Sequence, residues 1–387
     1  MAKTLTPREI LDRLVAFPTV SRDSNLDLID WVEEYLAGHG IAATRVPNAD
    51  GTKAALYAQA GPDMPGGVIL SGHTDVVPVD GQDWTSDPFA VAERGGRLYG
   101  RGTCDMKGFD ALALAALPLA LEAGVKRPIQ IALSYDEEVG CTGAAPMVAE
   151  MAARLPRAAA AIIGEPSMMQ AVTGHKGGIS FSTRIRGYEV HSSLMHTGVS
   201  AIMEAARLIE WANARNAEGQ AREPTPLAAM FEPPWTTVHV GRIAGGTAHN
   251  ITAADCAFDM GFRCVAGEDP QDWARAYRAA AAEVEAGMRR IRPEARIEIE
   301  QAFAVPALTP EEGGAAETLV RALTGDNGRH VVSYGTEAGH FQAAGYSAVV
   351  CGPGDIAQAH QPDEYIEIAQ FEAGWRFMQR LVDRLAA

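Results

Sequence analysis

The order of secondary-structure elements predicted between Ile179 and Ala304 constrains the fold of this chain more than any other feature. Six segments read as strand, helix, strand, strand, helix and strand: ISFSTRIRG, AIMEAARLIEWANAR, TTVHVGRIA, ADCAFDMGFR, DPQDWARAYRAAAAEVEAGMRR and ARIEIEQAFA. This βαββαβ order is that of a ferredoxin-like α+β domain. We therefore expect residues 178–305 to form one domain of this class.

Both helices of this segment carry apolar residues at the spacing of a single helical face, which predicts that these residues point into the domain core. The second helix is expected to start at Asp269 and Pro270, because an Asp N-cap followed by Pro is a common beginning. The predicted core residues are Ile202, Ala205, Ala206 and Ile209 in the first helix, and Trp273, Tyr277, Ala280, Ala281, Val284 and Met288 in the second.

The flanking parts of the chain follow a different pattern. Short apolar strands such as AALYAQA, GGVIL, IQIALSY and AAAIIGEP alternate with helical segments, and helix and strand return after about Val305. Alternation of this kind favours an α/β fold with a mixed, largely parallel sheet flanked by helices. We therefore predict that residues 1–177 and 306–387 are two parts of one catalytic domain, with residues 178–305 inserted between them.

Composition excludes several classes of partner. The formal net charge of −16 disfavours a nucleic-acid surface, which needs clustered Lys and Arg, and it is compatible with a small cationic ligand. The sequence shows neither an apolar signal core nor a run long enough for a membrane helix, so we expect a cytoplasmic protein without membrane contacts. The five cysteines have no CxxC spacing, which indicates reduced thiols.

Acids and imidazoles cluster where predicted strands give way to loops, in the stretches GHTDVV, GTCDMKG, SYDEEVG, IIGEPS and QAHQPDEY. Each stretch alone is a weak signal, because Asp and Glu are mostly exposed in any protein. Together they are informative, since the strand ends of an open α/β sheet converge on one crevice. The candidates from these stretches are His73, Asp105, Glu138, Glu165 and His360.

Two imidazoles and three carboxylates form a ligand set suited to zinc, with cobalt or manganese as alternatives. A two-metal hydrolase needs a carboxylate between its ions, further ligands for each and a base for the attacking water. Glu137 and Glu138 are neighbours whose side chains point in different directions, so one can hold metal while the other takes a proton. The sequence thus predicts a centre for two divalent ions.

The motifs SGHTDVVP, GRGTCDMKG, DEEVGCTGA, GEPS, VHSS and AHQPDEYI occur in this order along the chain. They resemble the successive motifs of the zinc-dependent amidohydrolases that include acetylornithine deacetylase, succinyl-diaminopimelate desuccinylase, aminoacylase and related carboxypeptidases. The stretches SNLDLIDWVEEYL and YGTEAGHFQ resemble the acetylornithine deacetylase branch in particular. The resemblance covers almost the whole chain.

This resemblance implies a role for each candidate in the crevice. One ion would be held by His73, Asp105 and Glu165, and the other by Glu138, His360 and the shared Asp105. Glu137 would be the general base. Asp75 would hydrogen-bond the metal-bound imidazole of His73 and fix its tautomer, and the peptide bond from Asp105 to Met106 would be cis.

The resemblance also implies that the inserted domain forms a homodimer and acts as a lid. His191 would reach the active site of the partner subunit and stabilise the oxyanion, and Asn250 would occupy a lid position. Arg263 would meet the α-carboxylate of the substrate, although an ion pair with Asp259 on the same strand face is an equal alternative. Thr336 is a weaker candidate for substrate contact. No role is assigned to His175, His196, His249 or His340.

The implied reaction is metal-dependent hydrolysis of an N-acyl amino acid, foremost N-acetyl-L-ornithine to L-ornithine and acetate in arginine biosynthesis. Alternatives are a succinyl-diaminopimelate desuccinylase, or hydrolysis of another N-acyl amino acid or dipeptide. A thiol hydrolase using Cys104 is disfavoured, because a cluster of five metal-type ligands has no place in that mechanism. A metal-binding regulatory relative without catalysis is the non-enzymatic alternative.

Overall fold

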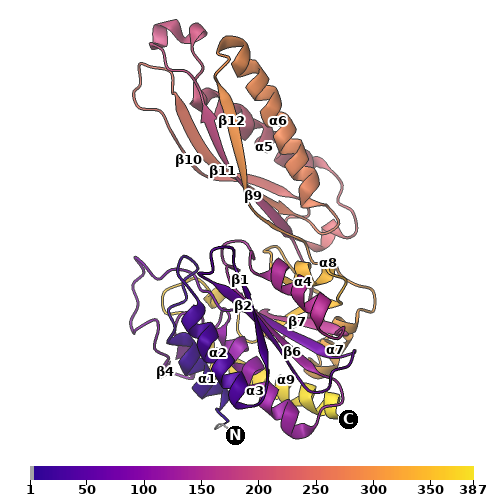
Figure 1. The fold of residues 1–387 in the computed structure, drawn as a ribbon. Coiled ribbons are helices and arrows are strands. Elements are labelled where there is room, and N and C mark those ends of the chain that lie inside the picture. The colour runs from indigo at the N-terminus through magenta and orange to yellow at the C-terminus, as the bar shows by residue number, and fades with distance from the viewer. Residues whose placement is uncertain (1–3) are drawn as a thin grey trace. The chain divides into compact units, whose positions relative to one another are not determined.

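The computed structural model describes residues 4–387, which divide into two compact units. The main unit comprises, among the described residues, 4–174, 308–330 and 336–387, and the inserted unit comprises 175–307 and 331–335. Figure 1 shows the elements of each.

The main unit is built on an eight-stranded sheet in the order β1-β2-β6-β3-β7-β14-β8-β13. Its central strand β3 pairs in parallel with both β6 and β7, and β7 pairs in parallel with β14. The antiparallel pairs are β1 with β2, β2 with β6, and β8 with β14. The mixed, largely parallel sheet expected from the sequence is confirmed. The strands are β1 (Ala43–Pro47), β2 (Ala54–Ala60), β3 (Val68–His73), β6 (Ile129–Ser134), β7 (Ala160–Pro166), β8 (Val172–His175), β13 (His330–Val332) and β14 (Ala348–Gly352).

Helices cover this sheet and bury its central strands. Every residue of β3, β6 and β7 is buried, as expected for parallel strands with helices on both faces. Helices α1, α2, α3, α7 and α9 contribute to one hydrophobic cluster with the sheet, while α4 contacts β2 and α8 contacts β14. The helices are α1 (Pro7–Val15), α2 (Leu26–Gly38), α3 (Lys107–Ala123), α4 (Ala144–Arg154), α7 (Ala315–Thr324), α8 (Ala338–Ala343) and α9 (Ile368–Ala386).

A small three-stranded sheet completes the main unit. It has the order β15-β5-β4 and consists of β4 (Ala92–Arg94), β5 (Arg97–Tyr99) and β15 (Tyr365–Glu367). Strand β15 follows the last predicted metal-type motif, and β5 precedes GTCDMKG, so the antiparallel pairing of β15 with β5 brings these two motifs together. No helix of residues 4–387 is both long enough and apolar enough to cross a membrane.

The inserted unit has the predicted βαββαβ order. Its four-stranded antiparallel sheet runs β10-β11-β9-β12, and helices α5 and α6 share a hydrophobic core with it. The elements are β9 (Gly177–Arg186), α5 (Ala201–Ala221), β10 (Thr237–Gly245), β11 (Asp255–Cys264), α6 (Pro270–Ile291) and β12 (Arg296–Val305). Asp269 caps α6 by accepting a hydrogen bond from the amide of Gln271, as predicted.

Of the residues predicted to form the core face of α5, Ala205 is buried as expected, whereas Ile202, Ala206 and Ile209 are not, so the buried face is rotated by about one residue from the predicted one. The buried side chains are Ala201, Ala205, Leu208 and Ala212, whereas Ile202 is 41% exposed. This face, mostly alanine, belongs to the core shared with the sheet, whereas the larger side chains of Ile202 and Met203 are exposed. Six large apolar side chains of this unit are 41–59% exposed, namely Leu194, Met195, Ile202, Met203, Ile243 and Ile291.

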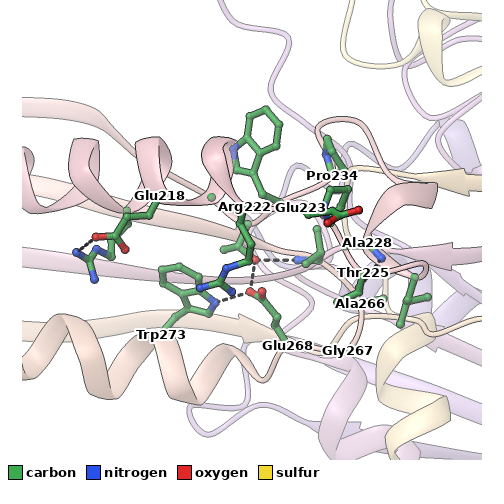
Figure 2. Close-up of a pocket in the computed structure, with 17 residues that line it drawn as sticks. Glu218, Arg222, Glu223, Thr225, Ala228, Pro234, Ala266, Gly267, Glu268 and Trp273 are labelled. Atoms are coloured by element: carbon green, nitrogen blue, oxygen red, sulfur yellow. Dashed lines mark hydrogen bonds and ion pairs between the residues drawn. The ribbon is translucent and has the colours of Figure 1, made fainter.

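The inserted unit also contains a cavity of about 350 Å³ between the end of α5 and the start of α6 (Figure 2). Trp235 and Trp273 line it together with Glu268. The carboxylate of Glu268 accepts hydrogen bonds from Thr236 Oγ1 at 2.6 Å and Trp273 Nε1 at 2.9 Å. These contacts give Glu268 a structural role, in joining the loop before β10 to α6.

Candidate metal centre

Three neighbouring parallel strands of the main unit deliver polar side chains to the same edge of the sheet. His73 is the last residue of β3, and Glu165 lies near the end of β7 on one side of it. Glu137 and Glu138 follow β6 on the other side. The carboxyl ends of parallel strands meet at one edge, so residues about 90 positions apart converge there.

Asp105 joins this group from the turn before α3, and His360 from the loop before β15. His73 Nε2 lies 3.0 Å from Oδ1 of Asp105, and His360 Nε2 lies 3.3 Å from its Oδ2. The two oxygens of one carboxylate therefore face two different imidazoles. The peptide bond between Asp105 and Met106 is cis, which confirms that expectation.

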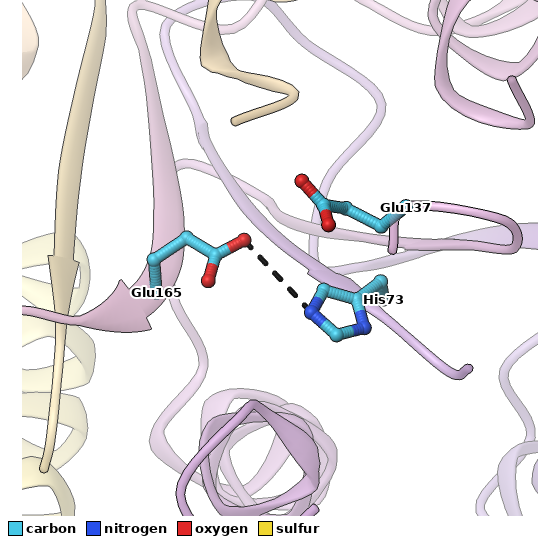
Figure 3. Close-up of side chains that lie close together, drawn as sticks. All are labelled: His73, Glu137 and Glu165. Carbon is cyan, nitrogen blue, oxygen red and sulfur yellow. Dashed lines mark ion pairs between the residues drawn. The ribbon is translucent and has the colours of Figure 1, made fainter. Parts of the chain in front are cut away.

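Each imidazole has a second carboxylate beside it. Glu165 Oε1 lies 3.9 Å from His73 Nε2, and Glu138 Oε2 lies 2.9 Å from His360 Nε2. Glu137 is also close, since ligand atoms of His73, Glu137 and Glu165 all lie within 4.8 Å of one another (Figure 3). The structure thus brings together all five residues predicted as metal ligands and the predicted base.

Two carboxylate oxygens of this cluster accept no hydrogen bond from the described residues. Oε1 of Glu138 and Oε1 of Glu165 are buried and accept no hydrogen bond. A buried carboxylate oxygen without a donor costs free energy unless a cation or a proton satisfies it. Imidazole nitrogens and carboxylate oxygens are donors that zinc, cobalt and manganese accept, so the residues fit a divalent centre.

The pKa values of the cluster follow from its crowded charges. Burial, followed by the carboxylates of Asp105 and Glu137, raises the pKa of Glu165 well above its usual value. Hydrogen bonds to Asp105 and Glu138 raise the pKa of His360 to about 10. Metal binding at such a site acts against these raised pKa values and releases protons.

Glu137 differs from the other acids in its surroundings. Burial raises its pKa to about 8, and the neighbouring carboxylates of Glu138 and Asp105 act in the same direction, against His73. The thiol of Cys141 donates a hydrogen bond to Glu137 Oε1 at 3.2 Å. Sequence reasoning missed Cys141, although its place four residues after Glu137 in DEEVGC was the available signal.

Asp75 contacts His73 through a different atom from the one expected. His73 Nδ1 lies 2.9 Å from the backbone carbonyl oxygen of Asp75 and 3.8 Å from its carboxylate. The carboxylate instead accepts hydrogen bonds from Ser21 Oγ at 2.7 Å and from the amides of Glu137 at 3.1 Å and Glu138 at 3.3 Å. Its side chain therefore orients the turn that carries the two glutamates, while its backbone orients the imidazole.

This arrangement predicts different effects for two aspartate substitutions. Asp105→Ala removes the carboxylate between both imidazoles, so we expect both metal content and the melting temperature of the metal-loaded protein to fall. Asp75→Asn keeps the backbone contact to His73, and we expect metal affinity or kcat to fall only ~10- to 100-fold. Metal analysis of the two purified variants checks this. A larger loss of metal in Asp75→Asn would contradict the assignment.

The inserted unit holds three of the predicted functional residues. His191 is exposed, and its Nδ1 accepts a hydrogen bond from the amide of Ser193 at 3.3 Å. This contact favours the tautomer with the proton on Nε2, the form that can donate to an oxyanion. Asn250 is also exposed, and its backbone carbonyl oxygen accepts a hydrogen bond from the amide of Ser192 at 2.8 Å.

Arg263 does not form the ion pair that was its alternative role. It is exposed near the end of β11 and makes no ion pair within residues 4–387, and Asp259 pairs with Arg242 at 2.7 Å. Its guanidinium is thus available to a ligand.

Two further candidates, Thr336 and Cys104, are buried in the main unit. Thr336 is fully buried, and its hydroxyl accepts a hydrogen bond from the amide of Ala338 at the start of α8. Burial raises the pKa of the Cys104 thiol far above its usual value, so a thiolate nucleophile is disfavoured there. All five cysteines of the chain are free and buried.

Comparison with known proteins agrees with this geometry. Residues 69–384 match peptidase family M20/M25/M40. The chain belongs to this family. An acetylornithine deacetylase of Myxococcus xanthus is 37% identical over 375 residues, covering 93% of this chain and 92% of that protein. One of Proteus mirabilis is 34% identical over 384 residues, covering 97% and 95%.

Solved structures share the fold. An M20 family metallo-carboxypeptidase from Sulfolobus solfataricus superposes with a TM-score of 0.79 at 17% identity, covering 99% of both chains. A Bacillus subtilis protein described as a dinuclear metal binding peptidase of the M20 family gives 0.65 at 15% identity, covering 98% of this chain and 97% of that one. The family resemblance read from the motifs is confirmed, and the M20 protein is an enzyme, a hydrolase of this family.

Proposed function

We propose that this M20 hydrolase cleaves the amide bond of N-acetyl-L-ornithine to give L-ornithine and acetate, using two divalent ions, foremost zinc. The observation that carries the proposal is the carboxylate of Asp105, whose two oxygens face His73 and His360 with a further glutamate beside each imidazole. The relatives named acetylornithine deacetylase support the substrate. The net charge of −16 suits a product with a cationic side chain.

In this proposal His73, Asp105 and Glu165 hold one ion, and Asp105, Glu138 and His360 hold the other. When bound, the ions supply water activation and polarisation of the acyl carbonyl. Glu137 takes a proton from the attacking water and returns it to the leaving amine, which a raised pKa near working pH favours. Arg263 and Asn250 contact the substrate, Arg263 through its α-carboxylate, and Thr336 is a further candidate contact.

We further propose that the protein is a homodimer through its inserted unit. Strand β10 lies at one edge of the four-stranded sheet, and large apolar side chains of this unit, Ile202 and Met203 among them, are exposed. Exposed apolar patches and open sheet edges are typical of protein interfaces. In such a dimer Nε2 of His191 donates to the oxyanion in the partner's active site.

The substrate is tested by comparing kcat/KM for N-acetylornithine, N-succinyl-diaminopimelate and N-acetylmethionine, with protein loaded with zinc, cobalt or manganese. We expect N-acetylornithine to be preferred, and activity to disappear with a chelator and return with metal. A preference for another of the three compounds would reassign the substrate within the same chemistry. No hydrolysis by protein shown to hold two ions would overturn the proposed function.

A further inference from the structure

The loop that carries His360 and the turn that carries Asp105 are joined by a buried carboxylate outside the predicted ligand set. Glu364 is 1% exposed and lies four residues after His360. Its Oε1 accepts hydrogen bonds from the amides of Gly102 at 3.0 Å, Cys104 at 2.9 Å and Asp105 at 3.0 Å. Three amides thus converge on one oxygen, in a backbone cradle that suits an anion.

The backbone of the Asp105 turn is shaped for this contact. Gly102 has a φ of +85°, a conformation that other residues rarely adopt, and a Cβ at this position would lie 2.9 Å from Val76 Cγ1. The amide of Gly100 also donates to the carbonyl oxygen of Glu364 at 2.9 Å, next to the pairing of β5 with β15. The turn therefore receives its shape from a segment about 260 residues later in the chain.

The other oxygen of Glu364 is connected to the backbone of His360 by hydrogen bonds through two further side chains. Oε2 accepts a hydrogen bond from Arg101 Nη1 at 2.7 Å, and Arg101 is also 1% exposed. Arg101 Nη2 donates to Gln82 Oε1 at 2.6 Å, and Gln82 Nε2 donates to the carbonyl oxygen of His360 at 3.0 Å. One connected network therefore reaches the amide of Asp105 and the carbonyl of His360.

We propose that Glu364 is a positioning residue that holds Asp105 and His360 in register with each other, so that both can bind the same ion. This inference rests on the proposed metal-dependent function. His360 has a side chain that is 54% exposed, so burial alone does not hold it in place. Two ligands on separate loops bind an ion well only if the loops are held in a fixed relation.

The test is the zinc affinity of the full-length Glu364→Gln protein, measured by competition with a chromophoric chelator well below the melting temperature. Glutamine keeps the size but loses the charge that Arg101 and the three amides face. We expect affinity to fall ~10- to 100-fold, as for other residues that orient metal ligands. Glu268→Gln is the matched control, because the carboxylate of Glu268 also accepts hydrogen bonds, here from two side chains, but lines the cavity of the inserted unit.

A milder variant covers the case in which Glu364→Gln does not fold. Gln82→Ala removes the link to His360 and the hydrogen bonds that Gln82 Oε1 accepts from Arg101 and Trp84, but it leaves the contacts of Glu364 with the three amides in place. We expect it to weaken one of two bound zinc equivalents. Unchanged zinc affinity in a folded Glu364→Gln protein, or in Gln82→Ala where the first does not fold, would overturn the positioning role. A fall in melting temperature of the chelator-treated protein without a fall in affinity would do the same. Wild-type protein that binds no zinc would instead refute the proposed function.

Discussion

Glu137→Gln should leave two equivalents of metal bound and reduce kcat ~10² to 10⁴-fold, the range expected when a positioned general acid and base is lost. Glutamine has the same shape and can still accept from the thiol of Cys141, but it cannot take a proton from water. Steady-state kinetics together with metal analysis of the same preparation measure both effects. KM should change far less than kcat, because the proposed proton transfers belong to the transition state.

The matched control is Glu138→Gln, which changes the neighbouring residue in the same way. Its Oε2 contacts His360, and its Oε1 has no protein partner among residues 4–387, so we expect this variant to lose bound metal. The comparison is needed because a carboxylate oxygen of Glu137 lies within 4.8 Å of possible ligand atoms of His73 and Glu165, so Glu137 could itself bind metal. Loss of metal from Glu137→Gln, with two ions retained in Glu138→Gln, would show that the roles are exchanged.

Mixing two inactive variants should restore activity if His191 serves the partner subunit. His191→Ala protein keeps its own metal ligands and Glu137, and Glu138→Ala protein keeps His191. In a mixed dimer the His191→Ala subunit receives His191 from its partner, so one complete site forms. Activity should rise towards roughly a quarter of wild type, because half of statistically mixed dimers then carry one working site of two.

The mixture must be compared with each variant alone and with a mixture in which both changes are in the same chain. When the doubly substituted chain exchanges with wild type, the mixed dimer has no complete site. This mixture therefore shows how subunit exchange changes activity when no site is rebuilt. No gain on mixing the single variants, after exchange has been shown with differently tagged chains, would place His191 in its own subunit's site or outside catalysis. A monomer in solution would refute the dimer proposal directly.

The sequence was sufficient where a pattern has a single physical meaning. Apolar runs such as VIL before His73 indicate a buried parallel strand, and polar residues at the ends of such strands must meet. It was insufficient where two residue types fit the same pattern. Ile202 and Ala201 are both apolar and adjacent, and only packing shows that the small side chain faces the sheet while the large one is exposed.

The sequence also could not predict contacts that are made by backbone atoms. The motif HTD indicates a carboxylate near an imidazole, but it does not show that the carbonyl of Asp75 contacts His73 while its carboxylate holds the following turn. Glu364 lies in the motif QPDEY, but three of its hydrogen-bond donors are backbone amides, which nearly every residue type carries. Because a backbone amide donates whatever its side chain, the residue types do not reveal such a contact.

The position of β14 in the sheet has a consequence for how the chain is made. This strand, which begins at Ala348, lies between β7 and β8, which end before Lys176. While the ribosome synthesises the inserted unit, β7 has an open edge and β8 lacks its neighbour in the sheet. An unpaired edge of this kind is prone to pair with other chains, and closing it late makes folding slow. The inserted unit has a hydrophobic core of its own and can begin to fold during that interval. His360 emerges later still, so the nascent chain acquires the last of the proposed metal ligands only after β14 has been made.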